Sequence, residues 1–207
     1  MKVLFPLKVA LLILFIASVV SCKKDKANPA PVSRSVEIAG EQYKTVSINT
    51  QTWTAANFKG PGGVLYDSGN SKPEYGKYYS LSEVKAVVLP AGWRIPSVQD
   101  YIKLAEYYGI KFTDNRAINQ PAANKLISTT RWMNVKGNNE SGFNAYPAGY
   151  IYNNSKPMDG DIAEFWTTDG RTFSIQEGAD RVSLRLLFYD DTAADGYKFN
   201  ARFVKDN

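Results

Sequence analysis

The chain contains no histidine and only one cysteine, Cys22. The missing histidine excludes Ser-His-Asp and Cys-His nucleophiles and every zinc site that uses histidine, and a single cysteine excludes a CxxC redox pair. The net positive charge is also small. It is +5 for the whole chain and +3 without Lys2 and Lys8, which lie in a segment that we predict below to be a signal peptide. Such a small and dispersed charge does not predict a nucleic-acid partner, because nucleic-acid surfaces need clustered lysine and arginine.

The composition is that of an ordinary globular chain. Of the 207 residues, 44% are apolar and 22% are charged, with 15 glycines and 10 prolines. These values exclude collagen-like and low-complexity chains, and the length predicts one domain or at most two small ones. Residues 36–207 contain no linker-like stretch, and a domain of this size buries about 70% of its unfolded surface, so one core suffices.

Long apolar runs are rare, and the one that stands out, residues 9–20, is broken only by Ser18. As a helix it would measure roughly 18 Å, whereas a bilayer core needs about 20 apolar residues. Because lysines precede this run and small residues follow it, we predict a secretory signal peptide over residues 1–21. The alternative is a buried core helix, which would need a surrounding core at the very start of the chain.

The leader ends in Val19-Val20-Ser21-Cys22, which resembles the bacterial lipobox. This resemblance implies that Cys22 is diacylated and becomes the first mature residue; the alternative is a plain signal peptide with a coincidental cysteine. Each buried acyl methylene contributes about 0.8 kcal/mol, so two or three chains anchor the protein firmly. Residues 22–35 are predicted to be the lipidated cysteine and a flexible tether. The charges after Cys22 are similar to those of Bacteroidetes lipoproteins and predict the outer membrane and the cell surface.

Alternating apolar residues and helix-capping patterns predict an α+β domain with an antiparallel sheet, two or three short helices and long loops. Strands are expected at residues 36–38, 43–48, 51–53, 181–189 and 197–204. Helices are expected at residues 80–88, 97–108 and 121–128, with Ser80 and Ser97 as caps. The buried faces are predicted to contain Val98, Tyr101, Ile102, Ala105 and Tyr108 in the second helix, and Val182, Leu184, Leu186 and Phe188 in one strand.

Several short motifs occur in a familiar order over most of residues 36–207. They are Gln51-Thr52-Trp53, Ala56-Asn57, Gly76-Lys77-Tyr78-Tyr79, Gly92-Trp93-Arg94-Ile95-Pro96-Ser97, Asn139-Glu140-Ser141-Gly142-Phe143, Ala148-Gly149-Tyr150, Phe165-Trp166-Thr167-Thr168 and Ala201-Arg202-Phe203-Val204-Lys205-Asp206. Together they resemble the Fibrobacter succinogenes major paralogous domain of Bacteroidetes lipoproteins. The resemblance implies a C-type-lectin-like fold in which the N- and C-terminal strands lie close together.

The resemblance also implies which residues are structural and which activity is absent. Residues 92–97 are similar to a segment of formylglycine-generating enzymes, but these enzymes use cysteines that this chain lacks, so their activity does not carry over. Trp53, Trp93 and Pro96 are expected to be structural. Family members often carry cysteines where this chain has Leu89 and Phe203, which implies that these two side chains are buried and in contact.

The segment from Tyr150 to Trp166 is the region in which lectin-like folds usually bind calcium and sugars, so it supplies most of the candidate ligand-binding residues. The candidates are Tyr150, Tyr152, Glu164, Trp166, Arg171 and Arg185. The aromatic rings could stack on sugars, and the two arginines could face an anionic ligand. The competing interpretation is that the rings belong to the core and that the arginines cover a solvated strand face.

No cofactor is expected, and calcium is the only metal left open. Asp159 and Asp161 flank Gly160 and could supply oxygen ligands, although the same pattern is ordinary in turns. The EPN and WND sequences of calcium-dependent sugar sites are absent. Asp191-Thr192-Ala193 resembles the O-glycan acceptor of Bacteroidetes, which makes Thr192 a glycosylation candidate.

The function expected from these features is a lipid-anchored surface protein without catalytic activity, whose lectin-like domain binds a glycan or a protein partner. One alternative is a structural or assembly component of the cell envelope with no small ligand. Another is a glycoside hydrolase, which would require two facing carboxylates, with Glu140 and Glu164 as the candidates.

Replacing Cys22 by alanine is expected to release the protein from the membrane. The variant lacks the thiol to which a lipid attaches, so it should yield a soluble or uncleaved product, whereas the wild type partitions into detergent. Fractionation of cells followed by detergent phase separation measures this difference. Unchanged membrane association of Cys22→Ala would contradict lipidation at this residue.

Overall fold

The structure, a computed structural model, describes residues 33–190 and 196–207, and its first three strands form an antiparallel meander. These strands are β1 (Ser33–Ile38), β2 (Glu41–Ile48) and β3 (Gln51–Thr54). The predicted tight turn between β1 and β2 is confirmed, with φ angles of 51° at Ala39 and 80° at Gly40. β1 begins inside the segment expected to be a tether, because Ser33 to Ser35 already pair with β2.

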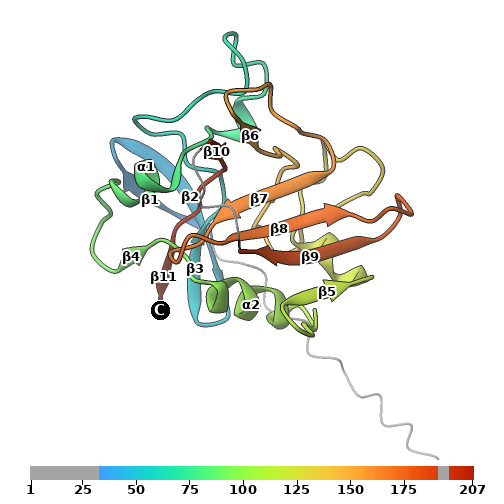
Figure 1. Cartoon of the computed structure of the whole chain (residues 1–207). Coiled ribbons are helices and arrows are strands. Elements are labelled where there is room, and N and C mark those ends of the chain that lie inside the picture. The colour runs from blue at the N-terminus through green and yellow to red at the C-terminus, as the bar shows by residue number, and fades with distance from the viewer. Residues whose placement is uncertain (1–32, 191–195) are drawn as a thin grey trace, which may run out of the picture.

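The two ends of the domain share one five-stranded sheet. Its order is β1-β2-β3-β11-β4, so β11 (Val204–Asp206), near the C-terminus, lies between β3 and β4 (Trp93–Arg94). Figure 1 shows the C-terminus beside the strands of the N-terminal meander. The expectation that the terminal strands lie close together is therefore confirmed.

A second sheet of four strands lies beside the first (Figure 1). Its order is β5 (Arg116–Ile118), β9 (Leu184–Tyr189), β8 (Thr172–Glu177) and β7 (Ile162–Trp166). A small sheet pairs β10 (Tyr197–Lys198) with β6 (Ile151–Tyr152). All pairings between these strands are antiparallel, which confirms an α+β class dominated by antiparallel sheets.

The predicted continuous strand over residues 197–204 is wrong. Its two ends, β10 and β11, belong to different sheets, and the chain between them crosses from one sheet to the other. Phe199 forms a bridge with Tyr79, and Asn200 forms one with Phe165. Alternation of apolar residues does not reveal this change of partner, because the side chains remain buried throughout the crossing.

The helices are α1 (Leu81–Lys85) and α2 (Val98–Tyr107), with single 3₁₀ turns η1 (Pro73–Tyr75) and η2 (Pro121–Lys125). Both helices start with a capping box, formed by Ser80 with Glu83 and by Ser97 with Asp100, which confirms the predicted caps. The weak helix expected over residues 121–128 is only the 3₁₀ turn η2. Within the described residues, no helix is long and apolar enough to cross a bilayer.

Helix α2 joins the two larger sheets through Tyr101. The Tyr101 ring centroid lies 5.2 Å from Trp53 of β3 and 4.4 Å from Phe173 of β8. The buried face differs from the predicted stripe, because Leu104 is buried while Val98 and Ile102 are only half-buried. Polar contacts of Asp100 explain this difference. Its carboxylate is buried and accepts hydrogen bonds from Gln51 and Arg94, so the side of the helix that contains Asp100 faces the core.

Val182 was predicted to be buried but is 80% exposed. β9 begins only at Leu184, because the Asp180 carboxylate accepts hydrogen bonds from the backbone N–H groups of Val182 and Ser183. This turn keeps the backbone before Leu184 out of the sheet. The remaining apolar residues of the predicted face, from Leu184 onward, are buried or half-buried.

The side chains expected to be structural lie in or against the core. Trp53, Pro96 and Phe203 are buried, and Trp93 is half-buried. Leu89 was expected to be buried but is only half-buried, although it packs against the apolar cluster that contains Phe203. The segment before Trp93 is also tied to the last strand by the pairing of β4 with β11.

Arg202 is the largest charged side chain in the core, with 0% of its surface exposed. Its Nε donates to Asn57 Oδ1 (2.6 Å), Nη1 donates to the carbonyl oxygens of Thr54 (2.7 Å) and Phe143 (3.0 Å), and Nη2 donates to the carbonyl of Asn144 (3.1 Å). None of the ion pairs formed by described residues includes this guanidinium. Burial lowers the pKa of Arg202 to about 9, so the group remains charged at neutral pH.

We expect Arg202→Met to lower the free energy of unfolding by about 3–5 kcal/mol, because it leaves buried carbonyl groups without a donor. Arg202→Lys should be nearly as damaging, since an ammonium group cannot reproduce the planar fork. Arg116→Met, which changes an exposed arginine of β5, is the control and should cost less than about 0.5 kcal/mol. Urea denaturation measures all three, and equal stability of the Arg202→Met variant and the wild type would contradict the assignment.

Candidate functional site

A cleft of about 440 Å³ lies where the four-stranded sheet meets β10 and the segment before β6; we call it the tyrosine cleft. Three tyrosines form much of its wall. Its lining residues are Tyr150, Ile162, Glu164, Gln176, Tyr189, Asp190, Tyr197 and Phe199.

Strand alternation places the polar floor of this cleft on one face of the sheet. Ile162 and Glu164 are two residues apart on β7 and therefore point to the same side. Gln176 of β8 stands opposite Ile162 in the register of the two strands. Gln176 Nε2 donates to the hydroxyl of Tyr189 on β9 at 2.9 Å, which holds this ring beside the floor.

Aromatic rings form a continuous series from the surface into the core beside the cleft. Tyr152 and Tyr197 have centroids 4.5 Å apart, and Tyr197 stacks on Phe199 at 5.6 Å with an interplanar angle of 8°. Phe199 then meets Trp166 edge-on at 4.8 Å. The rings beside the cleft therefore pack one against the next, from the exposed Tyr152 to the buried Trp166.

Glu164 is a buried carboxyl group on the floor of the cleft. Burial raises its pKa to about 7, and a hydrogen bond from the Thr172 hydroxyl at 2.6 Å opposes this rise only in part. Histidine is the side chain that ordinarily changes charge near neutral pH, and the chain contains none. Glu164, with its raised pKa, changes charge in that range instead. The floor can therefore both donate and accept hydrogen bonds.

Two of the six ligand-binding candidates, Tyr150 and Glu164, line the cleft. Tyr152 is not a lining residue, and its ring centroid lies 4.5 Å from that of Tyr197, which is one. Arg171 forms an ion pair (3.0 Å) with Asp190, a lining residue.

The other two candidates lie beside or behind the cleft. Arg185 is opposite Gln176 in the sheet register, and its Nε is buried without a hydrogen-bond partner among the described residues. Trp166 lies behind the wall at 1% exposure, and its indole N–H donates to the Tyr79 carbonyl at 2.7 Å. Its ring therefore offers no free face for stacking on a ligand.

Asp159, one of the two calcium candidates, already has protein partners. Its carboxylate forms an ion pair with Lys72 and accepts hydrogen bonds from the hydroxyls of Tyr66 (2.9 Å) and Tyr75 (3.1 Å). Asp161 is exposed and is not part of this group. In the described part of the chain, no set of three or more acidic, histidine or cysteine side chains is arranged to hold a metal ion.

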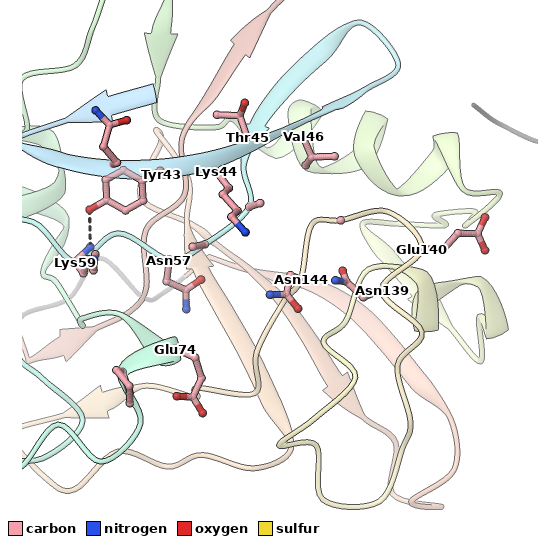
Figure 2. Close-up of a pocket in the computed structure, with 15 residues that line it drawn as sticks. Tyr43, Lys44, Thr45, Val46, Asn57, Lys59, Glu74, Asn139, Glu140 and Asn144 are labelled. Carbon is pink, nitrogen blue, oxygen red and sulfur yellow. Dashed lines mark hydrogen bonds between the residues drawn. The ribbon is translucent and has the colours of Figure 1, made fainter. Parts of the chain in front are cut away.

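A second concavity of about 600 Å³ lies between β2 and the loop of residues 139–144 (Figure 2); we call it the polar pocket. Its lining includes the side chains of Lys44, Asn57, Glu74, Asn139 and Asn144. Glu140 also lines this pocket, whereas Glu164 lines the tyrosine cleft. The two glutamates therefore do not form the facing pair that the hydrolase hypothesis requires.

Sequence reasoning did not identify Gln176, Tyr189 and Tyr197 as site residues. Tyr189 lies four residues after Arg185, so strand alternation places both side chains on the same face of β9 and could have identified Tyr189. Tyr197 belongs to the strand expected over residues 197–204, and nothing in that pattern distinguishes it as a site residue. Cys22 and Thr192 lie outside the described residues.

Comparison with known protein families gives a match over most of the chain. The model of the family described as the Fibrobacter succinogenes major domain matches residues 46–205. No curated protein and no solved structure shows significant similarity to the chain.

We expect Glu164→Gln to remove a pH dependence of stability. The folded chain keeps a proton that the unfolded chain releases above its ordinary pKa of 4.5. The resulting stabilisation is complete below pH 4.5 and is lost as the pH rises through about 7. Between pH 5 and pH 8 the wild type should therefore lose about 2–3 kcal/mol more unfolding free energy than the variant.

Denaturant titrations at the two pH values make this comparison, with Glu140→Gln as a control that changes an exposed carboxylate. The control should follow the wild type. Identical pH dependence in wild type and Glu164→Gln would show that Glu164 is not protonated in the folded chain at pH 5.

Proposed function

The chain belongs to the Fibrobacter succinogenes major domain family, and from this premise we propose that it is a binding protein without catalytic activity whose tyrosine cleft takes a glycan. We further propose that its domain is C-type-lectin-like and is held at the outer membrane, on the cell surface, by a lipid on Cys22. The observation that carries the proposal is the tyrosine cleft itself, in which aromatic walls stand over a polar floor.

A sugar presents both kinds of surface that this cleft complements. Its C–H faces pack on aromatic rings, and its hydroxyls hydrogen-bond to polar groups. Tyr189 is 39% exposed, so part of its ring is available to a ligand, and Tyr150 is half-buried beside it. Glu164 and Gln176 supply acceptors and donors on the floor. The volume of about 440 Å³ is within the usual range of small-molecule sites.

The fold and the leader support the remaining parts of the proposal. A lectin-like domain is expected to hold its N- and C-terminal strands close together, and β1 and β11 belong to one sheet here. The lipobox-like sequence at Cys22, the short apolar run before it and the proline-containing segment after it favour an anchored protein that extends away from the membrane.

One observation favours a second candidate, a glycoside hydrolase. Glu164 and Asp190 line the same cleft, and a carboxyl with a pKa near 7 is typical of a general acid. Asp190, however, is already paired with Arg171 at 3.0 Å. Binding without hydrolysis is therefore the function that the site supports best.

We expect the full chain to bind a subset of glycans on an array, and Tyr189→Ala to weaken the best of them about tenfold. Truncation removes one stacking face, and a loss of about 1.4 kcal/mol corresponds to a factor of ten. Tyr189→Phe keeps the ring and should retain most of the affinity. Tyr107→Ala, which removes a half-buried ring from helix α2, is the control and should bind as the wild type does.

Three outcomes would contradict the proposal in different ways. An array without signal, together with a blank pull-down from outer-membrane extract, would favour a structural component of the envelope. Binding that Tyr189→Ala leaves unchanged would place the glycan elsewhere. Release of reducing sugar, lost in Glu164→Gln, would make the protein a hydrolase.

A further inference from the structure

The polar pocket carries a positive charge that no partner within the described residues balances. Two carboxylates line it, but each already has a cation: Glu74 pairs with Arg131 at 2.5 Å, and Glu140 pairs with Lys125 at 3.1 Å. Figure 2 shows the carboxylate of Glu140 pointing away from the centre of the pocket.

The two lysines that line the pocket differ in their ion pairing. Lys59 is paired with Glu41 at 3.1 Å. Lys44 takes part in none of the ion pairs among the described residues. Behind the wall lies the buried guanidinium of Arg202, which donates to Asn57 Oδ1 and to the carbonyl of Asn144, both lining residues. Arg202 therefore places a further positive charge behind the wall of the pocket.

The side chains at the pocket can also form hydrogen bonds to a ligand. In Figure 2 the ammonium group of Lys44 and the amide of Asn144 point toward one another across the pocket. Asn139 lines the same wall, and its Oδ1 is buried, so the amide nitrogen is the atom that a ligand can reach. In Figure 2 this nitrogen points toward Asn144, where it can donate to a hydroxyl group of a ligand.

From these observations we propose that the polar pocket is a second ligand site that binds an acidic sugar, that is, a sugar bearing a carboxylate. The carboxylate lies against Lys44 and the amide of Asn144, and a ring hydroxyl accepts a hydrogen bond from the amide nitrogen of Asn139. The volume of about 600 Å³ accommodates a sugar of one or two rings. This site is separate from the tyrosine cleft and does not depend on glycan binding there.

Titration of the isotope-labelled full chain with glucuronate, followed by NMR, tests the proposal. We expect saturable shifts of the side-chain amides of Asn139 and Asn144, and no such shifts with glucose, which lacks the carboxylate. Lys44→Glu should weaken glucuronate binding at least tenfold, and Lys44→Gln by less. Raising the salt concentration should also weaken binding, since Lys44 is exposed. Lys103→Glu, an equivalent charge reversal on helix α2, should bind as the wild type does.

Each remaining outcome overturns the proposal. Equal shifts with glucose and glucuronate would mean that charge is not recognised. Unchanged affinity in Lys44→Glu, with an unchanged melting temperature, would remove Lys44 from the site. Loss of glucuronate binding in Tyr189→Ala but not in Lys44→Glu would place the sugar in the tyrosine cleft. Tighter binding of an acetylated dipeptide with a free carboxylate than of glucuronate would make this a peptide site.

Discussion

The fold depends on the buried guanidinium of Arg202. A charge in the core is tolerated only when its hydrogen-bonding groups are satisfied, and here the acceptors are backbone carbonyls and one amide rather than a carboxylate. Those acceptors come from the end of β3 and from the loop that contains Phe143 and Asn144. The Phe143 and Phe165 rings lie 4.9 Å and 5.4 Å from the guanidinium carbon, and they add cation–π attraction. One side chain therefore fixes segments that are distant in the sequence.

The crossing segment 199–203, which contains Arg202, also connects the two concavities. At one end Phe199 is part of the wall of the tyrosine cleft, and Asn200 donates to the carbonyls of Tyr75 and Lys77 at 3.0 Å. At the other end Arg202 lies behind the polar pocket. A regular strand would direct all its hydrogen bonds to neighbouring strands. This segment instead divides them between strands and loops: the carbonyls of Asn200 and Phe203 accept from Trp166 of β7 and Thr54 of β3, whereas the carbonyl of Ala201 accepts from Phe58 in a loop. The bonds to loop residues give the long loops defined positions.

The parts of the fold that could be predicted from the sequence are those that depend on near neighbours. The hairpin at Gly40 and the two capping boxes follow from residues three or four positions apart. The inward face of α2 could not be predicted, because it depends on Asp100 meeting Gln51, which is 49 residues away. The exposure of Val182 depends on the nearby Asp180 turn, but apolar alternation predicted the opposite, since periodicity does not reveal where a strand begins.

The candidate site also depends on contacts between residues that are distant in the sequence, and these contacts decide the charge of the two concavities. Tyr150 and Glu164 could be proposed as site residues because aromatic and acidic residues cluster in the segment from Tyr150 to Trp166, but the burial of Glu164 depends on long-range packing. Because of that burial, the two concavities differ in their charge near neutral pH. In the tyrosine cleft a carboxyl with a pKa near 7 is neutral or charged according to pH, so the cleft has no fixed attraction for ions. Behind the wall of the polar pocket, Arg202 remains charged at physiological pH. The ligands proposed for the two sites differ accordingly: a neutral sugar that stacks on the rings of the cleft, and an acidic sugar whose carboxylate lies against Lys44 in the pocket.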